Sequence, residues 1–572
     1  MRNSKAWVGV AISLVLAACG GGSKTDSDSN GGNSNANAGT SSASGGNNAG
    51  ASGASNGASG GTNGASGGVN NAGASGAVND AGAGGASGAS AGGVNSAGAS
   101  GASGAGATSM SERFRYGFNA GYPNPSFNDQ DFAGLGIRAG VSSERVSLPE
   151  QHLDRWGYDI ELNDVKGYRA LGMGELVGFL TAPTRAHSSA PSSATDDEAS
   201  LYIPKNLYEP ITTSDGKINP DNYWANYVYR TVSIYGEWIK TWEVWNEPDW
   251  VSDWQVTEAW ASRAPTPADL PRFHGSIFDY VRMLRVSSVA AKLANPSAKI
   301  ATGGLGYANF LDALLRYSDE PNAGAINSDF PATGKAYIDV VSFHHYPIYT
   351  QGNSESAVDG FLKQKAAFAA LIAKAKIQVG WECTETGAPH VALDGVPSGT
   401  AYAKNYLLKT MTLAPGAGIG GVHWFVLSDA KASGQSTDPY AFMGLYQPVQ
   451  SLTSPAQAQL TETGVAYRTL TSLLADAHYD DAATQSLALP ENARGAAYQS
   501  STPSDHRILV LWALPASSTS ETAALTLELP ADRSWRQHLW DFSKTNESEL
   551  LSPTNSTIQV TLDATPRIFV EE

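Results

Sequence analysis

Eight short apolar runs recur between residues 116 and 427, and stretches with helical periodicity lie between them. Most runs are rich in β-branched and aromatic residues, which is typical of buried parallel strands. Strands that alternate with helices predict a parallel sheet, and eight such units fit a (β/α)8 TIM barrel with insertions. The expected strands are Tyr116–Asn119, Arg145–Leu148, Glu175–Thr181, Thr241–Asn246, Lys299–Gly303, Val340–His344, Gln378–Thr384 and Gly421–Leu427.

An open doubly wound sheet is the alternative fold. It has little support, because no Gly-x-Gly-x-x-Gly turn follows one of these runs and opens a helix. The expected helices include Asn222–Lys240, His274–Leu293 and Ala357–Lys376, and Asn295-Pro296 is a stop signal for the second.

From about residue 482 the pattern becomes strand-rich. This predicts a small C-terminal β-sandwich, which we expect to pack on the barrel rather than bind sugar. Its expected strands are Ala496–Gln499, Arg507–Leu514, Ala523–Leu529, Gln537–Phe542, Thr557–Leu562 and Arg567–Glu571.

The first residues have the order of charge and apolarity of a secretory signal. A basic start precedes the apolar run 6–18, which is too short for a membrane span. The Leu-Ala-Ala-Cys motif ending at Cys19 resembles the lipobox of bacterial lipoproteins. The resemblance implies cleavage before Cys19, lipidation of its thiol and, because Gly20 follows, the outer membrane. An ordinary cleavable signal with an unrelated cysteine is the alternative.

Residues 20–110 cycle through Gly, Ala, Ser and Asn and contain no aromatic residue. Such a segment buries too little apolar surface to offset its ordering entropy, so we expect a disordered linker. The predicted organisation is therefore a signal peptide over 1–19, a linker over 20–110, a catalytic barrel over 111–478 and an accessory β-sandwich over 479–572.

The net charge of −17 lies entirely on the body of the chain, because the charges up to residue 110 cancel. This acidity argues against nucleic acid as a partner. The 2 cysteines of the chain exclude a disulfide-rich scaffold, and no CxxC pair suggests zinc. The body has no apolar run long enough to span a membrane, so a membrane contact is expected only through the N-terminal anchor.

Polar residues gather where the expected strands end. Strand four ends with Trp245-Asn246-Glu247-Pro248, strand six with His344-His345-Tyr346, and strand seven with Thr384-Glu385. In a barrel these carboxyl ends carry the chemistry, and two carboxylates beside buried strands are costly unless compensated. Glycosidic cleavage needs such a pair, with one carboxyl group protonated and the other ionised.

The strand-four run Trp-Glu-Val-Trp-Asn-Glu-Pro, residues 242–248, closely resembles the acid/base signature of retaining glycoside hydrolases of clan A. The nearest likeness is family 39, the type of β-xylosidases and exopolysaccharide hydrolases. The resemblance spans roughly residues 114–475. The Trp-Asn-Glu-Pro core is specific, whereas each of the other strand ends is a weak signal alone.

The resemblance implies a role for each matching position. Glu247 becomes the general acid/base and Glu385 the nucleophile, with their carboxyl groups about 5–5.5 Å apart in a retaining enzyme. The remaining implied roles are a bond from Asn246 to the sugar 2-hydroxyl, orientation of the nucleophile by Tyr346, a bond from Arg145 that keeps Glu385 ionised, and sugar stacking on Trp424. His344 lies on the same strand face as Tyr346 by the period of two.

Other interpretations of these residues stay open. Glu382 lies three residues before Glu385, and strand alternation allows only one of them to point inward; the Thr-Glu-x-Gly ending favours Glu385. His344, His345 and His423 could be metal ligands, but no carboxylate or cysteine stands at ligand spacing in the sequence, so we expect no metal. Cys383 is expected to be a small buried residue.

Aromatic residues could extend a binding site beyond these positions. Trp250, Trp254 and Trp260 in the loop after strand four could build sugar subsites or pack beneath that loop.

The sequence thus predicts a retaining glycosidase that acts on a β-linked polysaccharide or oligosaccharide without a cofactor. A non-catalytic polysaccharide-binding surface lipoprotein and a transglycosylase are the alternatives. The acidity of the body favours neutral glycans over polyanionic ones. The expected location is the cell surface or the periplasmic face of the outer membrane.

Overall fold

The computed structural model describes residues 113–122, 124–501 and 506–572. The expected signal peptide, the lipidation site Cys19 and the linker all lie outside these residues. In the part of the chain that is described, no helix is both long enough and apolar enough to cross a membrane.

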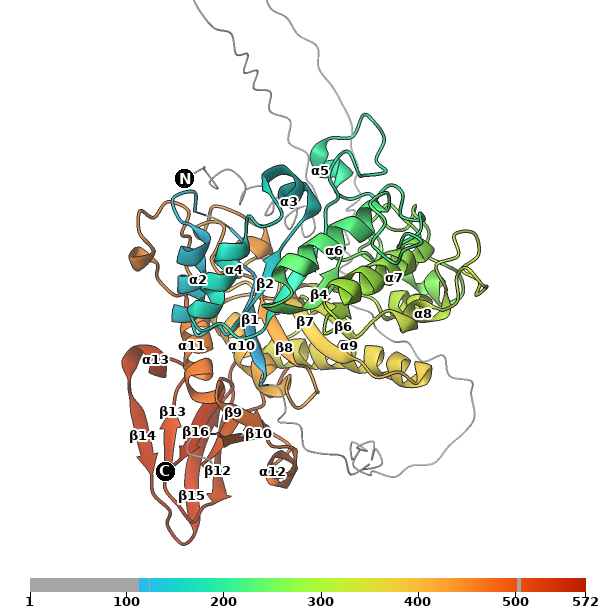
Figure 1. The fold of residues 1–572 in the computed structure, drawn as a ribbon. Helices are drawn as coiled ribbons and strands as arrows, with labels where there is room; N and C mark the ends of the chain where they lie inside the picture. Colours follow the sequence, from blue (N-terminus) through green and yellow to red (C-terminus); the bar gives the residue numbers. More distant parts are fainter. Residues whose placement is uncertain (1–112, 123, 502–505) are drawn as a thin grey trace, which may run out of the picture. The chain divides into compact units, whose positions relative to one another are not determined.

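Eight parallel strands close into a barrel in chain order, because β1 pairs with both β2 and β8 (Figure 1). The (β/α)8 prediction is confirmed, and each expected strand overlaps an observed one. The strands are β1 (Arg115–Phe118), β2 (Ser143–Ser147), β3 (Leu176–Leu180), β4 (Ile239–Val244), β5 (Lys299–Ala301), β6 (Val340–His345), β7 (Gly380–Thr386) and β8 (Gly421–Trp424).

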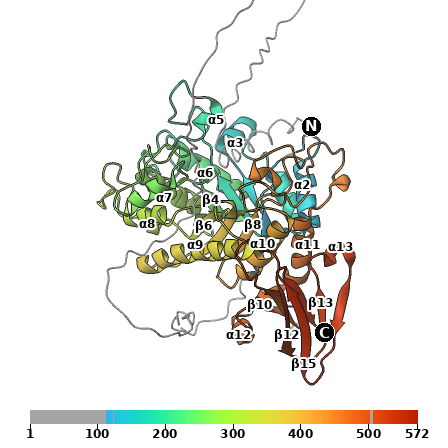
Figure 2. The same cartoon turned by 180° about the vertical axis from the view of Figure 1, so that it is seen from behind.

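Helices surround the barrel, and their ends follow the capping chemistry of the sequence (Figures 1 and 2). In α7 the Ser276 and Asp279 side chains form a capping box, and Asn295 caps the helix at its end. The helices from α2 to α11 are α2 (Asp129–Arg138), α3 (Glu150–Trp156), α4 (Leu162–Ala170), α5 (Asp196–Ala199), α6 (Tyr223–Tyr235), α7 (Ile277–Ala294), α8 (Ala308–Arg316), α9 (Ser354–Ala375), α10 (Thr400–Leu413) and α11 (Glu462–Leu474).

Long insertions follow the carboxyl ends of several strands. Residues 181–222 connect β3 to α6 and hold the short helix α5. The connection from β4 to α7 contains the 3-10 helix η2 (Trp254–Ala261), and η4 (Pro347–Tyr349) and η5 (Pro439–Phe442) follow β6 and β8. These insertions carry the side chains that surround the end of the barrel where strands β4, β6 and β7 finish.

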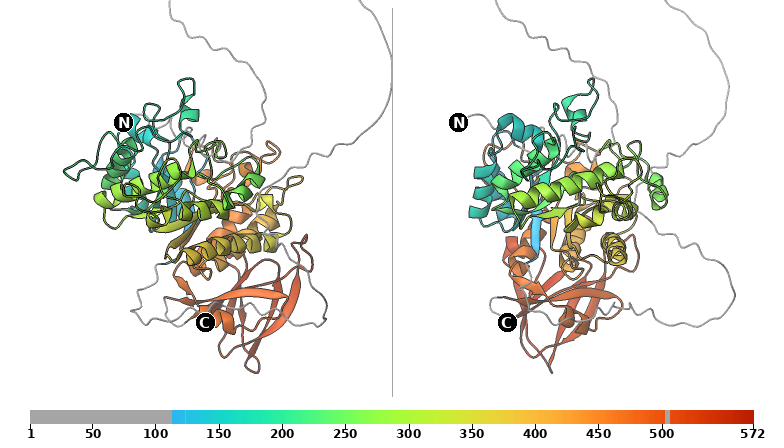
Figure 3. Two further views of the ribbon diagram at one scale, coloured as in Figure 1. Left: turned by 90° about the vertical axis from the view of Figure 1, so that its right-hand side faces the viewer. Right: turned by 45° about the vertical axis from the view of Figure 1, so that its right-hand side comes forward.

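The C-terminal part forms a six-stranded antiparallel sheet and a two-stranded sheet (Figure 3). Leu509 and Leu511 of the larger sheet and Val560 and Leu562 of the smaller belong to one apolar core, as expected for a sandwich. The elements are β9 (Ala477–Tyr479), α12 (Asp481–Ser486), β10 (Ala493–Ser500), β11 (Arg507–Ala513), β12 (Ala524–Pro530), β13 (Trp535–His538), α13 (Phe542–Thr545), β14 (Ser548–Leu551), β15 (Thr557–Asp563) and β16 (Arg567–Glu571).

One expected strand there is misplaced. The range Gln537–Phe542 was expected to be extended, but β13 ends at His538 and the helix α13 begins at Phe542. The sequence pattern also missed β9 and β14, which are only 3 and 4 residues long. Strands this short carry too few residues for an alternation of apolar and polar side chains to stand out.

Polar contacts join the C-terminal part to the start of α9. The Glu521 carboxylate accepts hydrogen bonds from the Ser354 hydroxyl at 2.7 Å and the Asn405 amide at 2.8 Å. Nearby, the buried Lys409 ammonium and the Arg494 guanidinium both pair with Glu355, at 3.0 and 2.6 Å. The contact between the sandwich and the barrel therefore includes a network of charges around the buried Lys409.

Candidate active site

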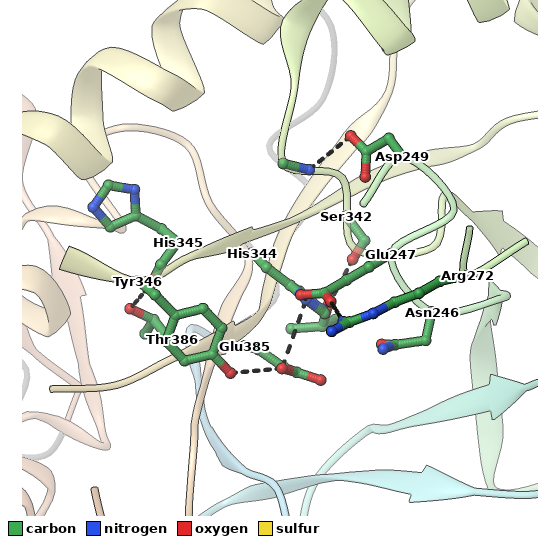
Figure 4. A network of polar contacts seen from close by, with 12 residues as sticks. Asn246, Glu247, Asp249, Arg272, Ser342, His344, His345, Tyr346, Glu385 and Thr386 are labelled. Atoms are coloured by element: carbon green, nitrogen blue, oxygen red, sulfur yellow. Dashed lines mark hydrogen bonds and ion pairs between the residues drawn. The ribbon is translucent and has the colours of Figure 1, made fainter. Parts of the chain in front are cut away.

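Glu247 lies on a turn directly after β4. The turn places Trp245 at φ +72° and Glu247 at φ +46°, in the left-handed region that residues with a Cβ seldom adopt. The Glu247 N–H donates to the Gly303 carbonyl at 2.6 Å, which holds this conformation. As a result the carboxylate of Glu247 faces the side chains at the ends of β6 and β7 (Figure 4).

Two cationic or dipolar groups contact the Glu247 carboxylate. The Arg272 guanidinium donates to Oε2 at 3.0 Å, and Nδ1 of His344 lies 2.9 Å from Oε1. Arg272 also stacks on the Trp250 ring at 3.8 Å, which fixes the plane of its guanidinium. Both carboxylate oxygens of Glu247 are thus engaged, although the residue keeps 9% of its surface exposed.

Glu385 lies on β7 and is completely buried. Arg145 Nη1 donates to its Oε1 at 2.5 Å, and the Tyr346 hydroxyl donates to its Oε2 at 2.6 Å. Burial raises the pKa of Glu385, but the charges of His344 and Arg145 and the bonds from Tyr346 and Arg145 outweigh burial, so the pKa lies below its ordinary value. These contacts keep Glu385 ionised.

His344 stands between the two carboxylates. Its Nδ1 is 2.9 Å from Glu247 and 3.6 Å from Glu385, and its Nε2 is 3.1 Å from the Thr384 hydroxyl. Burial lowers the pKa of His344, but the Glu385 charge and the bond to Glu247 raise it above its ordinary value. One carboxylate oxygen of Glu247 and one of Glu385 lie within 4.8 Å of each other across this imidazole.

Arg145 joins the site to a third carboxylate, that of Glu243. Its Nε and Nη2 bond the two oxygens of this fully buried group at 3.0 and 2.8 Å. Burial raises the pKa of Glu243, and the Arg145 charge opposes that rise. Arg145 Nη2 also donates to the Asn246 side-chain oxygen at 2.9 Å, which leaves the Asn246 amide N–H groups to bond another partner.

Six of the expected site residues therefore meet at one end of the barrel. They are Arg145, Asn246, Glu247, His344, Tyr346 and Glu385.

The exception within the barrel is Trp424, the expected stacking platform. Its ring is fully buried, and its indole N–H donates to the Met443 carbonyl at 2.8 Å. No ring face remains for a sugar, because the ring is completely covered and packs against Tyr406 at 6.1 Å. An exposed aromatic ring of this region is Tyr349, with 42% of its surface accessible and its hydroxyl 2.8 Å from that of Tyr440.

The three tryptophans after β4 have different environments. Trp260 is completely buried and packs edge-on against Phe310 at 5.8 Å, so it supports its loop. Trp250 and Trp254 are partly exposed, and Trp250 lies beneath the Arg272 guanidinium beside Glu247. Only these two remain as candidates for contacts with a sugar.

The sequence showed no carboxylate at ligand spacing with the histidines, but in the structure two carboxylates do lie beside His344. Glu247, His344 and Glu385 place one ligand atom each within 4.8 Å of one another, although sequence spacing gave no sign of it. The arginines that pair with both carboxylates disfavour a dication at the same place.

The other two histidines lie apart from the carboxylate pair. His345 bonds the Gln364 oxygen at 2.6 Å, and His423 lies 3.2 Å from the Ser143 hydroxyl. Burial lowers the pKa of His345 to about 4 and that of His423 to about 3, so both stay neutral. Cys383 is buried as expected, and burial raises the pKa of its thiol well above the ordinary value.

Sequence reasoning missed Glu243 and Arg272 as members of the site. Glu243 carried a signal, because a charge inside an otherwise apolar strand needs a buried partner. Arg272 carried none, since it comes from the long connection between η2 and α7. Asp249 is a related case: it accepts from the N–H groups of Gly306 and Tyr307 at 2.9 and 2.8 Å and holds the loop after β5 against the site (Figure 4).

Comparison with known proteins bears on the fold. No protein-family model matches the chain, and no curated protein matches it. A solved family 39 glycoside hydrolase from the gut symbiont Bacteroides cellulosilyticus WH2 is similar, with a TM-score of 0.54 and 16% identity over 81% of this chain and 82% of that one.

Two further solved structures are more distant. A glucosidase from Croceicoccus marinus has 13% identity and a TM-score of 0.49 over 80% of this chain and 96% of its own. A family 51 α-L-arabinofuranosidase from Bifidobacterium longum has 13% identity and a TM-score of 0.47 over the same shares of the two chains. The resemblance read from the Trp-Asn-Glu-Pro motif is thus confirmed at the level of the fold: the chain shares the architecture of a family 39 glycoside hydrolase.

Proposed function

We propose that this protein is a retaining glycoside hydrolase that cleaves β-glycosidic bonds of a polysaccharide or oligosaccharide through a covalent glycosyl-enzyme. The observation that carries the proposal is the pair Glu247 and Glu385, whose carboxylate oxygens lie within 4.8 Å of each other in unlike environments. This spacing suits the retaining mechanism, in which the carboxyl groups are about 5–5.5 Å apart, better than the inverting one, which needs about 6.5–9.5 Å.

Glu385 is the nucleophile in this mechanism. Arg145 and Tyr346 hold its carboxylate ionised, so that it attacks the anomeric carbon as the glycosidic bond breaks. Glu247 gives its proton to the departing oxygen and then takes a proton from the water that releases the sugar. His344 Nδ1, 2.9 Å from Glu247 Oε1, holds that carboxyl group in place through both steps.

The charge of the site favours a neutral glycan. Two arginines, Arg145 and Arg272, face the carboxylates of Glu243, Glu247 and Glu385. Both guanidinium groups already bond carboxylate oxygens of these residues. An anionic sugar would therefore meet no uncommitted cation among these side chains. Asn246 suits a bond to the 2-hydroxyl, and the exposed ring of Tyr349 suits stacking in place of Trp424.

A screen of neutral β-glycans and aryl β-glycosides tests the activity. Glu247→Gln and Glu385→Gln should both abolish hydrolysis of glycans, while Glu258→Gln, an exposed glutamate of η2, should keep it. An aryl glycoside with an activated leaving group separates the roles, because it needs no proton to depart. Glu247→Gln should then release one equivalent of the phenol in a burst, and Glu385→Gln should release none. Full activity in either variant would refute the assignment.

Two alternative functions predict different products from the same glycan. A transglycosylase would yield longer oligosaccharides rather than reducing ends, and a non-catalytic binding protein would bind a glycan without releasing any product. The anchored location is a further proposal, which rests on the Leu-Ala-Ala-Cys motif alone. Cys19→Ala should move the protein from the membrane fraction to the soluble fraction of its host cell, and a variant that stayed bound would contradict lipidation.

A further inference from the structure

A second group of carboxylates lies outside the barrel, where the helices α2 and α4 both begin. Asp129 is the first residue of α2, Glu161 is the N-cap of α4, and Asp164 lies in the first turn of α4. One carboxylate oxygen of each residue lies within 4.8 Å of the others. The two helices run side by side next to β1 and β2 (Figure 1).

Acidic residues at helix starts are common, because they interact favourably with the helix dipole. That effect accounts for Asp129 or Asp164 taken singly. It does not account for three carboxylates from two helices converging on one point, since like charges at this spacing repel one another.

A fourth carboxylate, from β2, points at the same group. Ser143 and Arg145 face the barrel interior, where they contact His423 and Glu243, so alternation turns Glu144 toward the helices. Glu144 is 94% buried, from its 6% exposure, and its Oε2 has no hydrogen-bond partner among the described residues. A buried carboxylate oxygen without a partner is costly, which indicates that a ligand belongs there.

The surroundings of the group supply little positive charge. His152 Nε2 lies 2.7 Å from Glu161, and the Gln130 amide lies 3.3 Å from Asp164. Across the residues that the structure describes, no arginine or lysine pairs with any of the four carboxylates. Burial and the charges of Glu161 and Asp164 accordingly raise the pKa of Asp129 to about 7.

We propose that Asp129, Glu144, Glu161 and Asp164 bind a calcium ion. Calcium takes six to eight oxygen ligands at about 2.3–2.6 Å, so oxygens on opposite sides of the ion are about 4.6–5.2 Å apart. The carboxylate oxygens of Asp129, Glu161 and Asp164, all within 4.8 Å of one another, meet this requirement with little movement. Magnesium demands a near-ideal octahedron at about 2.0–2.1 Å and keeps several of its waters, so it suits a cluster made entirely of protein carboxylates less well than calcium does.

Calcium at this place would fasten α2 and α4 to the outer face of β2. The inner face of the same strand carries Arg145, which bonds Glu243 and Glu385. The inference does not depend on the proposed hydrolase activity, because the site lies on the other side of the strand.

Titration calorimetry of the full chain tests the site, after treatment with EDTA and desalting. Calcium chloride should bind with a stoichiometry of one and raise the melting temperature, and magnesium chloride should bind at least tenfold more weakly. Glu144→Gln, which removes a buried charge and should still fold, and the double variant Asp129→Asn/Asp164→Asn should each weaken calcium binding at least tenfold. The matched control is Asp196→Asn/Asp197→Asn at the start of α5. This variant also removes two acidic side chains from the first turn of a helix, but at a place outside the proposed site.

If the four carboxylates merely share protons, calcium at millimolar concentration will leave the melting temperature unchanged. The wild-type protein will then lose stability as the pH rises from the ordinary carboxyl pKa of 3.8 to about 7, because over that range the unfolded chain has lost the proton that folded Asp129 still holds. That pair of outcomes would overturn the proposal, as would equal calcium affinity in the wild type and in Glu144→Gln.

Discussion

The hydroxyl group of Tyr346 is the contact whose removal best tests how Glu385 is kept ionised. It donates to Glu385 Oε2 at 2.6 Å, and both residues are buried. The Tyr346 ring packs edge-on against Tyr440 at 5.0 Å and Phe425 at 6.0 Å. Tyr346→Phe keeps these ring contacts, so it deletes the hydrogen bond to Glu385 and almost no packing.

The size of the effect follows from the charge on the acceptor. A hydrogen bond to a charged group contributes about 1.5–3 kcal/mol, and about 1.4 kcal/mol corresponds to a tenfold change. The bond stabilises only the ionised carboxylate, so its loss raises the pKa of Glu385. On the acid side of the pH profile, where few molecules carry ionised Glu385, kcat/KM should therefore fall by about 10- to 150-fold, with a smaller loss on the plateau.

The same bond predicts a pH-dependent change in stability. A carboxyl group whose folded pKa is depressed stabilises the fold above its unfolded pKa, and this contribution is lost as the pH falls through the folded value. Tyr346→Phe should thus lower the free energy of unfolding at neutral pH. The difference from the wild type should vanish in acid below both pKa values.

The assay is the pH profile of kcat/KM on the best aryl glycoside from the screen, with melting temperatures measured over the same pH range. Tyr440→Phe is the control, because its hydroxyl pairs with that of Tyr349 at 2.8 Å within the same aromatic cluster. The acid limb should move to higher pH in Tyr346→Phe and stay in place in Tyr440→Phe. A uniform loss across the pH range, with the acid limb unmoved, would refute the reasoning.

Three further variants test the supports of the site. Glu243→Gln should cost about 1.5–3 kcal/mol by chemical denaturation, because one charged bond to Arg145 is lost. Trp424→Phe should lower stability by about 1–3 kcal/mol, since the Met443 carbonyl loses its donor, and should leave KM unchanged; a large rise in KM would restore Trp424 as a sugar platform. Glu521→Gln should cost about 1–2 kcal/mol, because it weakens the contact with the start of α9, and equal melting temperatures would exclude that role.

Much of the fold could be predicted because buried parallel strands have a distinctive sequence pattern. Each barrel strand is covered on both faces, so it reads as a short apolar run between polar stretches. The same logic located Glu247 and Glu385, since a charged residue at the end of such a run stands out. The C-terminal sheets were less readable, because strands such as β14 are short and exposed and show no alternation.

The parts of the site that sequence could not supply come from long connections. Arg272 and Tyr349 reach the carboxylates or their surroundings from segments whose path depends on tertiary packing. The prediction that Trp424 stacks on a sugar was wrong for a related reason. A tryptophan at the end of a strand can point to either face, and here the ring is fully buried and its indole N–H bonds the Met443 carbonyl.

The relation between Glu382 and Glu385 shows where the alternation rule itself fails. The rule allows only one of them to face inward, yet both do: Glu382 pairs with Arg115 across the lower barrel, and Glu385 pairs with Arg145. The register of β7 shifts by one residue against both β6 and β8 between Cys383 and Thr386, which is a β-bulge.

The bulge also has a chemical consequence. It turns two adjacent residues, Thr384 and Glu385, to the same side of the strand. The Thr384 hydroxyl then bonds Ser342 at 2.7 Å and His344 Nε2 at 3.1 Å, so the imidazole presents Nδ1 to the carboxylates. A regular strand would supply either the nucleophile or the group that orients His344, and the irregular one supplies both.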